Sequence, residues 1–160
     1  MVDFKGSHYL KEVMLYAVFF YVRYAVSYRS LEDILAERGV PIDHATLNRW
    51  VVKYSPLIAA QAKCRKYKPS GSWRMDETYI EVKGKWMYFY RAVTKHGKTL
   101  DFMLSEHRFI KKLTRLMKGF KSFQSASATL DGIDVAHMIR KQQFSTSGQS
   151  AFQQFAALAA

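Results

Sequence analysis

Asp76 is the residue in this chain whose surroundings best fit metal-dependent chemistry. It lies within residues 72–80 (SWRMDETYI), whose bulky and β-branched side chains predict a strand. Asp is disfavoured in strand interiors, so its position here needs a reason. One reason is a role as a cation ligand in phosphoryl transfer, and the other is an ion pair with Arg74 or a nearby lysine. Two-metal phosphoryl transfer requires several carboxylates around ions about 3.5–4 Å apart, so Asp76 alone is insufficient.

An antiparallel sheet is predicted around Asp76. The expected strands are 73–82, 85–93 and 99–104. Gly84 and Gly97 lie in the two short connections, where glycine is typical of tight hairpin turns. Side chains alternate between the two faces of a strand, so Asp76 shares its face with Arg74 and Thr78. The sequence therefore predicts a sheet that presents Asp76 on one face.

The first 56 residues are predicted to form a small helical bundle. Residues 11–24 are apolar on most faces, which indicates a central helix. The apolar run within it, 13–22, is too short to span a bilayer, and no targeting segment is evident. The chain also has one cysteine, Cys64, which excludes a disulfide framework and fits a reducing cytoplasm.

A second and a third helix are expected to follow in this bundle. The expected capping residues are Ser27 or Ser30 for the second helix and Asp43 for the third. Gly39 is placed to end the second helix, and the third is predicted over 44–54, ending at Ser55-Pro56. Helix, glycine-containing turn and capped helix are typical of a helix-turn-helix, although plain helical hairpins share the pattern.

Polar side chains at these helix starts are candidates for DNA contact. The candidates are Arg29 for phosphate, and His44, Thr46, Asn48, Arg49 and Lys53 on the third helix. Asn and Arg are geometrically suited to adenine and guanine edges in the major groove. The net charge is +12, and residues 44–75 contain no acidic residue. This distribution favours a polyanionic partner, nucleic acid first, over a merely solvated polar face.

Motifs along the chain together closely resemble the DDE transposases of bacterial insertion sequences, specifically insertion sequence family six. The motifs include YAVSYR, NRWV, WRMDETY, KGKW, YFYRAV and TLDF, then GFKSF, TLDGI and MIRK. The resemblance runs over about 4–105 and resumes over about 108–144. It implies an N-terminal helix-turn-helix for the element's terminal inverted repeats. It also implies an RNase-H-like core that uses Asp, Asp and Glu with Mg²⁺ to cut and join DNA, with Asp76 as the first acid.

The later acids of that family are missing from this sequence. The second acid of the family lies in a Thr-Asp-Lys-like motif, which is absent here, and the third in Glu-x-Asp-His-Arg. The nearest counterpart is Glu106-His107-Arg108, where Glu106 directly precedes the histidine. An internal deletion near Glu106 explains this simply. A shifted third ligand at Glu106 is the other explanation, and it still leaves the second ligand absent. The sequence therefore predicts no strand-transfer activity.

The predicted architecture is α+β, with a helix-turn-helix bundle before a truncated RNase-H-like core. The expected divisions are a DNA-binding domain (1–56), a basic linker (57–72), a partial catalytic domain (73–144) and a frayed tail (145–160). The region after Glu106 is expected to be helical, with a break near Gly119. Its basic residues Lys111, Lys112 and Arg115 are further candidates for DNA contact.

Three interpretations of the function remain open at this point. The chain is an active transposase completed by other copies or by a full-length transposase, a DNA-binding remnant, or a decayed product. The missing acids favour the second and third interpretations over the first.

Overall fold

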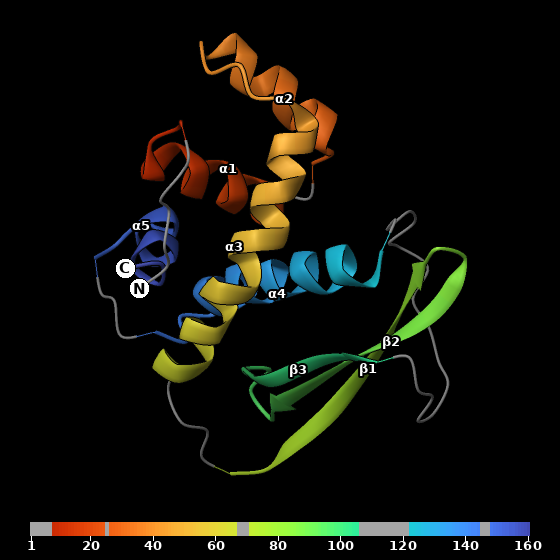
Figure 1. Ribbon diagram of the computed structural model, residues 1–160. Coiled ribbons are helices and arrows are strands. Elements are labelled where there is room, and N and C mark those ends of the chain that lie inside the picture. The colour runs from red at the N-terminus through yellow and green to blue at the C-terminus, as the bar shows by residue number, and fades with distance from the viewer. Residues whose placement is uncertain (1–7, 25, 67–70, 106–121, 145–147) are drawn as a thin grey trace.

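The computed structural model describes residues 8–24, 26–66, 71–105, 122–144 and 148–160. Within these residues the chain forms helices and a single sheet (Figure 1). The helices are α1 (Lys11–Tyr24), α2 (Tyr28–Glu37), α3 (His44–Arg65), α4 (Phe123–Arg140) and α5 (Ala151–Ala157). The strands are β1 (Trp73–Val82), β2 (Lys85–Thr94) and β3 (Thr99–Ser105). The α+β prediction is confirmed.

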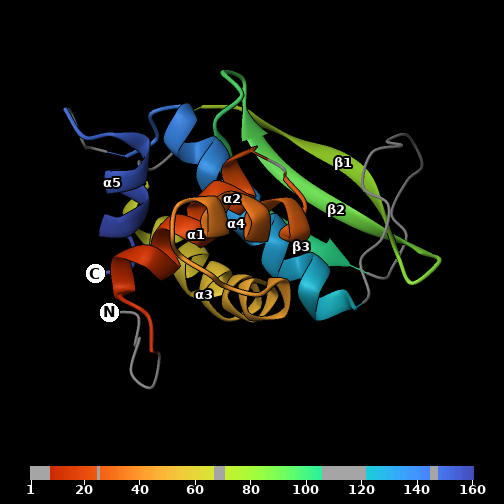
Figure 2. The same ribbon diagram turned by 90° about the horizontal axis from the view of Figure 1, so that it is seen from above.

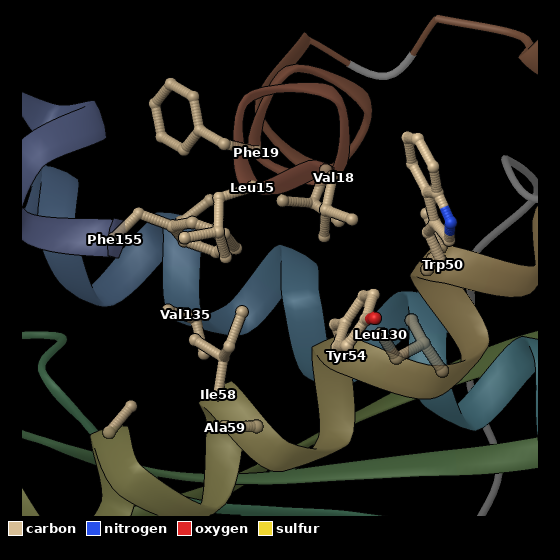
Figure 3. Packing of buried hydrophobic residues seen from close by; sticks show 14 of the residues in the cluster. Leu15, Val18, Phe19, Trp50, Tyr54, Ile58, Ala59, Leu130, Val135 and Phe155 are labelled. Carbon is tan, nitrogen blue, oxygen red and sulfur yellow. The ribbon is translucent and has the colours of Figure 1, made fainter. Parts of the chain in front are cut away.

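α1 is the central helix of the bundle and contacts each of the other four described helices. Its side chains Leu15 and Val18 point into the core that α3, α4 and α5 complete (Figure 3). Burying an aliphatic side chain of this size contributes about 1.5–3 kcal/mol, so α1 organises the bundle chiefly through its apolar faces. Among the described helices, none has both the length and the apolar character needed to cross a bilayer.

Local capping sets the ends of α2 and the start of α3. The Ser27 side chain accepts a hydrogen bond from the Ser30 amide, and Gly39 follows α2 with φ of +76°. Asp43 caps α3 by accepting hydrogen bonds from the amides of Ala45 and Thr46. These contacts confirm the predicted helix boundaries here, because each satisfies backbone groups that a helix terminus leaves unpaired.

α3 does not end at Pro56, as the sequence predicted, but continues to Arg65. Proline removes one backbone donor and crowds the preceding turn, which disfavours a helix interior. The helix continues because residues beyond Pro56 pack against α4, and Ile58 and Ala62 are fully buried. The expected linker over 57–72 is thus helical over its first half.

The strands form an antiparallel sheet in the order β1-β2-β3. Lys83 and Gly84 connect β1 to β2, and both have positive φ, as two-residue hairpin turns require. The register places Asp76 opposite Arg91. The strand predictions are confirmed, with β2 ending at Thr94 and β3 at Ser105, one residue later than expected.

The two faces of the sheet have different environments. α4 lies along one face, where Ile80, Phe89 and Phe102 are buried in the common core (Figure 2). No described helix covers the opposite face, named here the outer sheet face. Its most informative side chains are Trp73, Met75, Glu77, Trp86 and Met103. Trp73 and Trp86 are exposed on this face.

The C-terminal region is more ordered than the sequence suggested. A helix was expected over 108–144, and α4 confirms it within the described residues, whereas 106–121 lie outside them. The prediction of a frayed tail over 145–160 is wrong for residues 148–160, which include α5. A capping box between Ser150 and Gln153 starts α5, and Phe155 is fully buried against α1. The low charge of the tail reflects burial rather than disorder.

Candidate active site and DNA-facing surface

Asp76 lies in the first half of β1, on the face that α4 covers. Thr78 and Ile80 continue the same face, and burial increases along β1 toward Ile80. The Asp76 side chain retains 38% exposure. The alternation predicted from the sequence is therefore confirmed, and Asp76 is accessible at the margin of the sheet.

Two arginines surround the Asp76 carboxylate. Arg74 Nε lies 3.4 Å from Oδ1, and Arg91 Nη2 lies 3.9 Å from Oδ2. Ion pairs of this exposure contribute about 0–1 kcal/mol each, so their main effect is on local charge rather than on stability. The ion pair between Asp76 and Arg74, one of the two explanations that the sequence offered for Asp76, is therefore observed. Arg91 of β2 also approaches the Asp76 carboxylate.

Asp134 of α4 is an acid near this face that was not among the predicted site residues. Its side chain is almost completely buried, and Oδ1 lies 3.7 Å from Arg91 Nη1. Burial raises the pKa of Asp134 to about 7, although the Arg91 guanidinium opposes the shift. Burial also raises the pKa of Asp131 to about 6. Asp134 and Asp76 therefore share one arginine, and Oδ2 of Asp134 has no hydrogen-bond partner.

The described residues around Asp76 do not fit a two-metal centre. Within the described part of the chain, no three or more His, Cys, Asp or Glu side chains cluster closely enough to hold a metal ion. The guanidinium groups of Arg74 and Arg91 add positive charge where two divalent cations would have to bind. Glu106, the candidate shifted ligand, lies outside the described residues.

The first turns of α3 hold a chain of side-chain hydrogen bonds. The Thr46 hydroxyl donates to Asp43 Oδ2 at 2.6 Å, and Arg49 Nη2 donates to Thr46 Oγ1 at 2.7 Å. The hydrogen bond from Thr46 is the largest of the effects that lower the pKa of Asp43. Arg49 is exposed, so its guanidinium is held at the start of α3 while remaining accessible.

His44 is paired with an acid from the neighbouring helix. Its Nδ1 lies 2.8 Å from Glu32 Oε2, and its backbone amide donates to the same oxygen at 3.1 Å. The sequence did not single out Glu32, because the pairing depends on how α2 packs beside α3. His44 thus contributes to the α2–α3 contact as well as to the exposed surface.

The remaining predicted DNA contacts are placed differently from one another. Arg29 and Lys53 are exposed, and the Lys53 ammonium lies 5.1 Å from the centre of the Tyr54 ring. Asn48 is half-buried and its side chain approaches the Tyr28 hydroxyl, which faces the bundle interior. The structure therefore brings Thr46 and Arg49 together on the outer surface, with Asn48 directed away from them. The candidates Lys111, Lys112 and Arg115 lie outside the described residues.

Comparison with protein families gives a match in the part of the chain that contains Asp76. A family model described as a DDE domain matches residues 70–109. The matched segment covers all three strands of the sheet. No solved structure matches the chain.

Curated relatives extend this likeness over most of the chain. A transposase for insertion sequence-like element IS431mec from Staphylococcus aureus is 43% identical over 119 residues, which are 70% of this chain and 53% of that protein. The transposase for insertion sequence element IS257 in transposon Tn4003, from the same species, has the same identity and coverage. An uncharacterised protein, pYV0051, from Yersinia pseudotuberculosis is 62% identical over 37 residues, 23% of this chain and 35% of that protein. The resemblance to insertion-sequence transposases is confirmed, and the matched region spans about half the length of the transposases.

Proposed function

We propose that this chain is a DNA-binding protein of transposase origin that recognises the terminal inverted repeats of an insertion sequence and does not transfer DNA strands. The observation that carries the proposal is the capped start of α3, where Thr46 and Arg49 form a hydrogen-bonded, accessible pair. The resemblance to insertion-sequence transposases supplies the class of DNA.

The α2–turn–α3 unit is assigned as a helix-turn-helix. In such units the second helix enters the major groove with its first turns facing the bases, while the first helix crosses the backbone. Arg49 is placed to read a guanine edge, since its guanidinium offers paired donors to O6 and N7. Arg29 in the first turn of α2 is assigned to phosphate, where it positions the protein without reading sequence.

The sheet is assigned as the start of an RNase-H-like core. An Asp on the first strand of an antiparallel meander fits that fold, and the DDE domain match covers this segment. The family implies Mg²⁺ as cofactor, with Asp76 as its first ligand. The second Asp and third Glu have no counterpart in this sequence, and two arginines neutralise Asp76. We therefore infer that the catalytic part is defective as this chain stands.

DNA recognition is tested by fluorescence anisotropy with two labelled duplexes. One carries a terminal inverted repeat of an insertion sequence whose transposase resembles this chain, and the other carries the same bases in scrambled order. Specific complexes are typically about 10³–10⁷ tighter than non-specific ones. A clear preference for the repeat at physiological salt is the expected result. Equal affinity for the two duplexes would reject sequence-specific recognition and indicate only non-specific binding through positive charge.

Catalysis is tested separately with the same repeat DNA in a strand-transfer reaction containing Mg²⁺ or Mn²⁺. The expected result is no joined product. Joined product that disappears in Asp76→Asn would reject the inferred defect. Addition of the purified chain to a reaction run by a full-length transposase distinguishes the remaining interpretations. A DNA-binding remnant lowers the yield by competing for the ends, whereas a chain that assembles into an active complex does not.

A further inference from the structure

Glu32 of α2 and His44 at the start of α3 make a two-point contact that the proposed function does not use. α2 packs beside the first turns of α3 (Figure 1). Glu32 Oε2 accepts a hydrogen bond from the His44 amide at 3.1 Å and lies 2.8 Å from His44 Nδ1. One carboxylate oxygen therefore holds both the backbone and the ring of His44. The Glu32 and His44 side chains are 35% and 52% exposed, so the ring remains accessible.

This contact determines which ring nitrogen of His44 carries hydrogen. An ionised carboxylate only accepts hydrogen bonds, so Nδ1 is the donor to Glu32. In a neutral imidazole the second nitrogen, Nε2, then carries the lone pair. The partial positive charge at the start of a helix opposes a cation on this ring. Within the described residues Nε2 makes no hydrogen bond, so it is the ring atom open to a ligand.

The charge around the pair favours a base edge over a phosphate as that ligand. Asp43 precedes His44 and accepts hydrogen bonds from the amides of Ala45 and Thr46. The carboxylates of Asp43 and Glu32 thus occupy the first amides of α3, which could otherwise bind a phosphate. Both carboxylates repel a phosphate, whereas an uncharged base edge meets no such repulsion. In a helix-turn-helix this turn faces base edges in the major groove.

We propose that Glu32 is a positioning residue that makes His44 Nε2 a hydrogen-bond acceptor for an exocyclic amine of a base. Adenine N6 and cytosine N4 are the amines that the major groove presents, whereas guanine O6 and thymine O4 are acceptors. An acceptor at Nε2 therefore selects adenine or cytosine and disfavours guanine or thymine. It complements Arg49, whose guanidinium offers only donors. This inference rests on the proposed function, because it names bases that the same surface reads.

The first experiment uses the free protein and needs no DNA. Long-range proton–nitrogen correlation spectra of isotope-labelled protein distinguish the Nδ1–H and Nε2–H tautomers of histidine, and the signal missing in His44→Ala identifies His44. The Nδ1–H tautomer is expected in wild type and in Asp33→Ala, the matched control that removes an exposed acid from α2. Glu32→Ala removes the acceptor, so His44 is expected to return to the Nε2–H form that histidine favours in water.

The second experiment measures binding to terminal-repeat duplexes that lack one amine. Unsubstituted purine replaces one adenine, or deoxyzebularine replaces one cytosine, at each position in turn. Each analogue lacks only the exocyclic amine of the base that it replaces. At one position the analogue is expected to weaken wild-type binding by about two- to tenfold, the contribution of one hydrogen bond. The base normally present there identifies the amine as that of adenine or of cytosine.

The same duplexes separate positioning of His44 from a merely structural role of Glu32. In His44→Ala and Glu32→Ala the analogue at that position is expected to cause no further loss of affinity. In Asp33→Ala it is expected to cause the same loss as in wild type. A structural defect would instead weaken binding to every duplex by the same factor and preserve the effect of the analogue. Circular dichroism verifies that each variant is folded.

Three outcomes would overturn the proposal. These are a wild-type His44 ring that is Nε2–H or doubly protonated in the binding buffer, full wild-type affinity for every amine-free duplex, and a loss from the analogue that Glu32→Ala leaves unchanged. Equal wild-type affinity for the repeat and the scrambled duplex would reject the proposed function and this inference with it. A preference for the repeat without any effect of the analogues would reject this inference alone.

Discussion

Arg91 shows how a single side chain determines the environment of two acids from different elements. From β2 it reaches Asp76 on the neighbouring strand and Asp134 on α4. Asp76 is partly exposed, so water also stabilises its charge, whereas Asp134 is buried and depends on Arg91. The Arg91 guanidinium therefore helps to neutralise Asp76, whereas it only partly compensates the cost of burying the charge of Asp134. Of these two acids, Asp134 is the one whose protonation is expected to affect stability.

Asp134 is expected to make the protein less stable as pH rises through the weakly acidic range. Its folded pKa is about 7 against an ordinary value of 3.8, so the folded state binds more protons between these values. The contribution of Asp134 to the free energy of unfolding therefore falls as pH rises from about 4 to about 7, by a few kcal/mol. Asp134→Asn removes this term, and urea unfolding at several pH values measures the difference from wild type.

The difference between the two proteins is the informative quantity, because other groups titrate in the same range. Asp131, with a pKa of about 6, acts in the same direction as Asp134. His137 acts in the opposite direction, because burial lowers its pKa to about 4. Its folded form loses its proton at a lower pH than its unfolded form, so its contribution to stability increases as pH rises through this range. If the wild-type and Asp134→Asn curves run parallel, Asp134 is not the titrating group.

Arg49 is the residue whose removal is expected to separate specific from general DNA binding. A good bidentate contact discriminates against the wrong base by about 1–3 kcal/mol. Arg49→Ala should therefore weaken binding to the terminal repeat by about fivefold or more, and binding to the scrambled duplex much less. Fluorescence anisotropy with both duplexes measures the two losses. Lys85→Ala, which removes one exposed cation from the β-hairpin, is the charge-matched control, and equal losses in Arg49→Ala would reject base reading.

At the scale of elements, the crossing of α1, α3 and α4 depends on close backbone approach. Gly132 of α4 lies at this crossing, where an added Cβ would come within 2.5 Å of Val22 Cγ1 and 2.9 Å of Ser55 Oγ. Gly in a helix interior is normally unfavourable, so its presence here indicates that packing outweighs helix propensity.

Gly132→Ala is therefore expected to destabilise the protein although alanine favours helices. Overpacking costs about 1–3 kcal/mol, and the gain in helix propensity offsets at most about 1 kcal/mol of it. Urea unfolding should show a lower free energy of unfolding in this variant. Gln124→Ala, at an exposed position of α4, supplies the comparison, and a Gly132→Ala protein more stable than wild type would contradict the packing account.

α5 is expected to be part of the folding unit rather than an appendage. Phe155 is fully buried and its ring lies 5.4 Å from that of Phe19. Replacing a buried Phe by Ala costs about 3–5 kcal/mol, so Phe155→Ala should lower the free energy of unfolding substantially. Gln149→Ala, at an exposed position before α5, should have little effect. A negligible loss of unfolding free energy in Phe155→Ala, measured in the same way, would instead support the prediction that the tail is frayed.

At the scale of the whole molecule, charge is divided between surfaces. The start of α3 presents Arg49 and Lys53, whereas Glu77 and Glu81 lie on the outer sheet face, where no described strand residue is a Lys or Arg. A polyanion is attracted to the first surface and repelled from the second. The net charge of +12 therefore favours association with DNA without making every face of the molecule a DNA-binding face.

DNA binding is consequently expected to weaken steeply with salt on both duplexes. Each phosphate contact to B-DNA contributes a slope of about −0.9 in log K against log salt concentration. The terminal repeat and the scrambled duplex should have similar slopes, with the repeat remaining tighter throughout, because base contacts add affinity without releasing counterions. Anisotropy titrations over a range of salt concentrations measure both slopes. Binding that is insensitive to salt would exclude a phosphate-based interface.

The sequence alone was sufficient to predict the features that depend only on neighbouring residues in the chain. The caps at Ser27 and Asp43 and the turn at Gly84 follow from side-chain acceptors and backbone freedom within a few residues. The strands and the face of Asp76 follow from alternation, which needs no knowledge of distant contacts. The transposase resemblance was likewise carried by motifs in the linear sequence.

Contacts between distant segments decided the rest. α3 passes through Pro56 because α4 buries Ile58 and Ala62, and α5 forms because α1 offers a surface for Phe155. Asp134 lies near Asp76 only because α4 lies on the sheet and Arg91 reaches both acids. Helix propensity, charge and residue spacing depend on neighbours in sequence, so the sequence shows them directly. Burial and ion pairing depend on neighbours in space, so only the folded chain determines them.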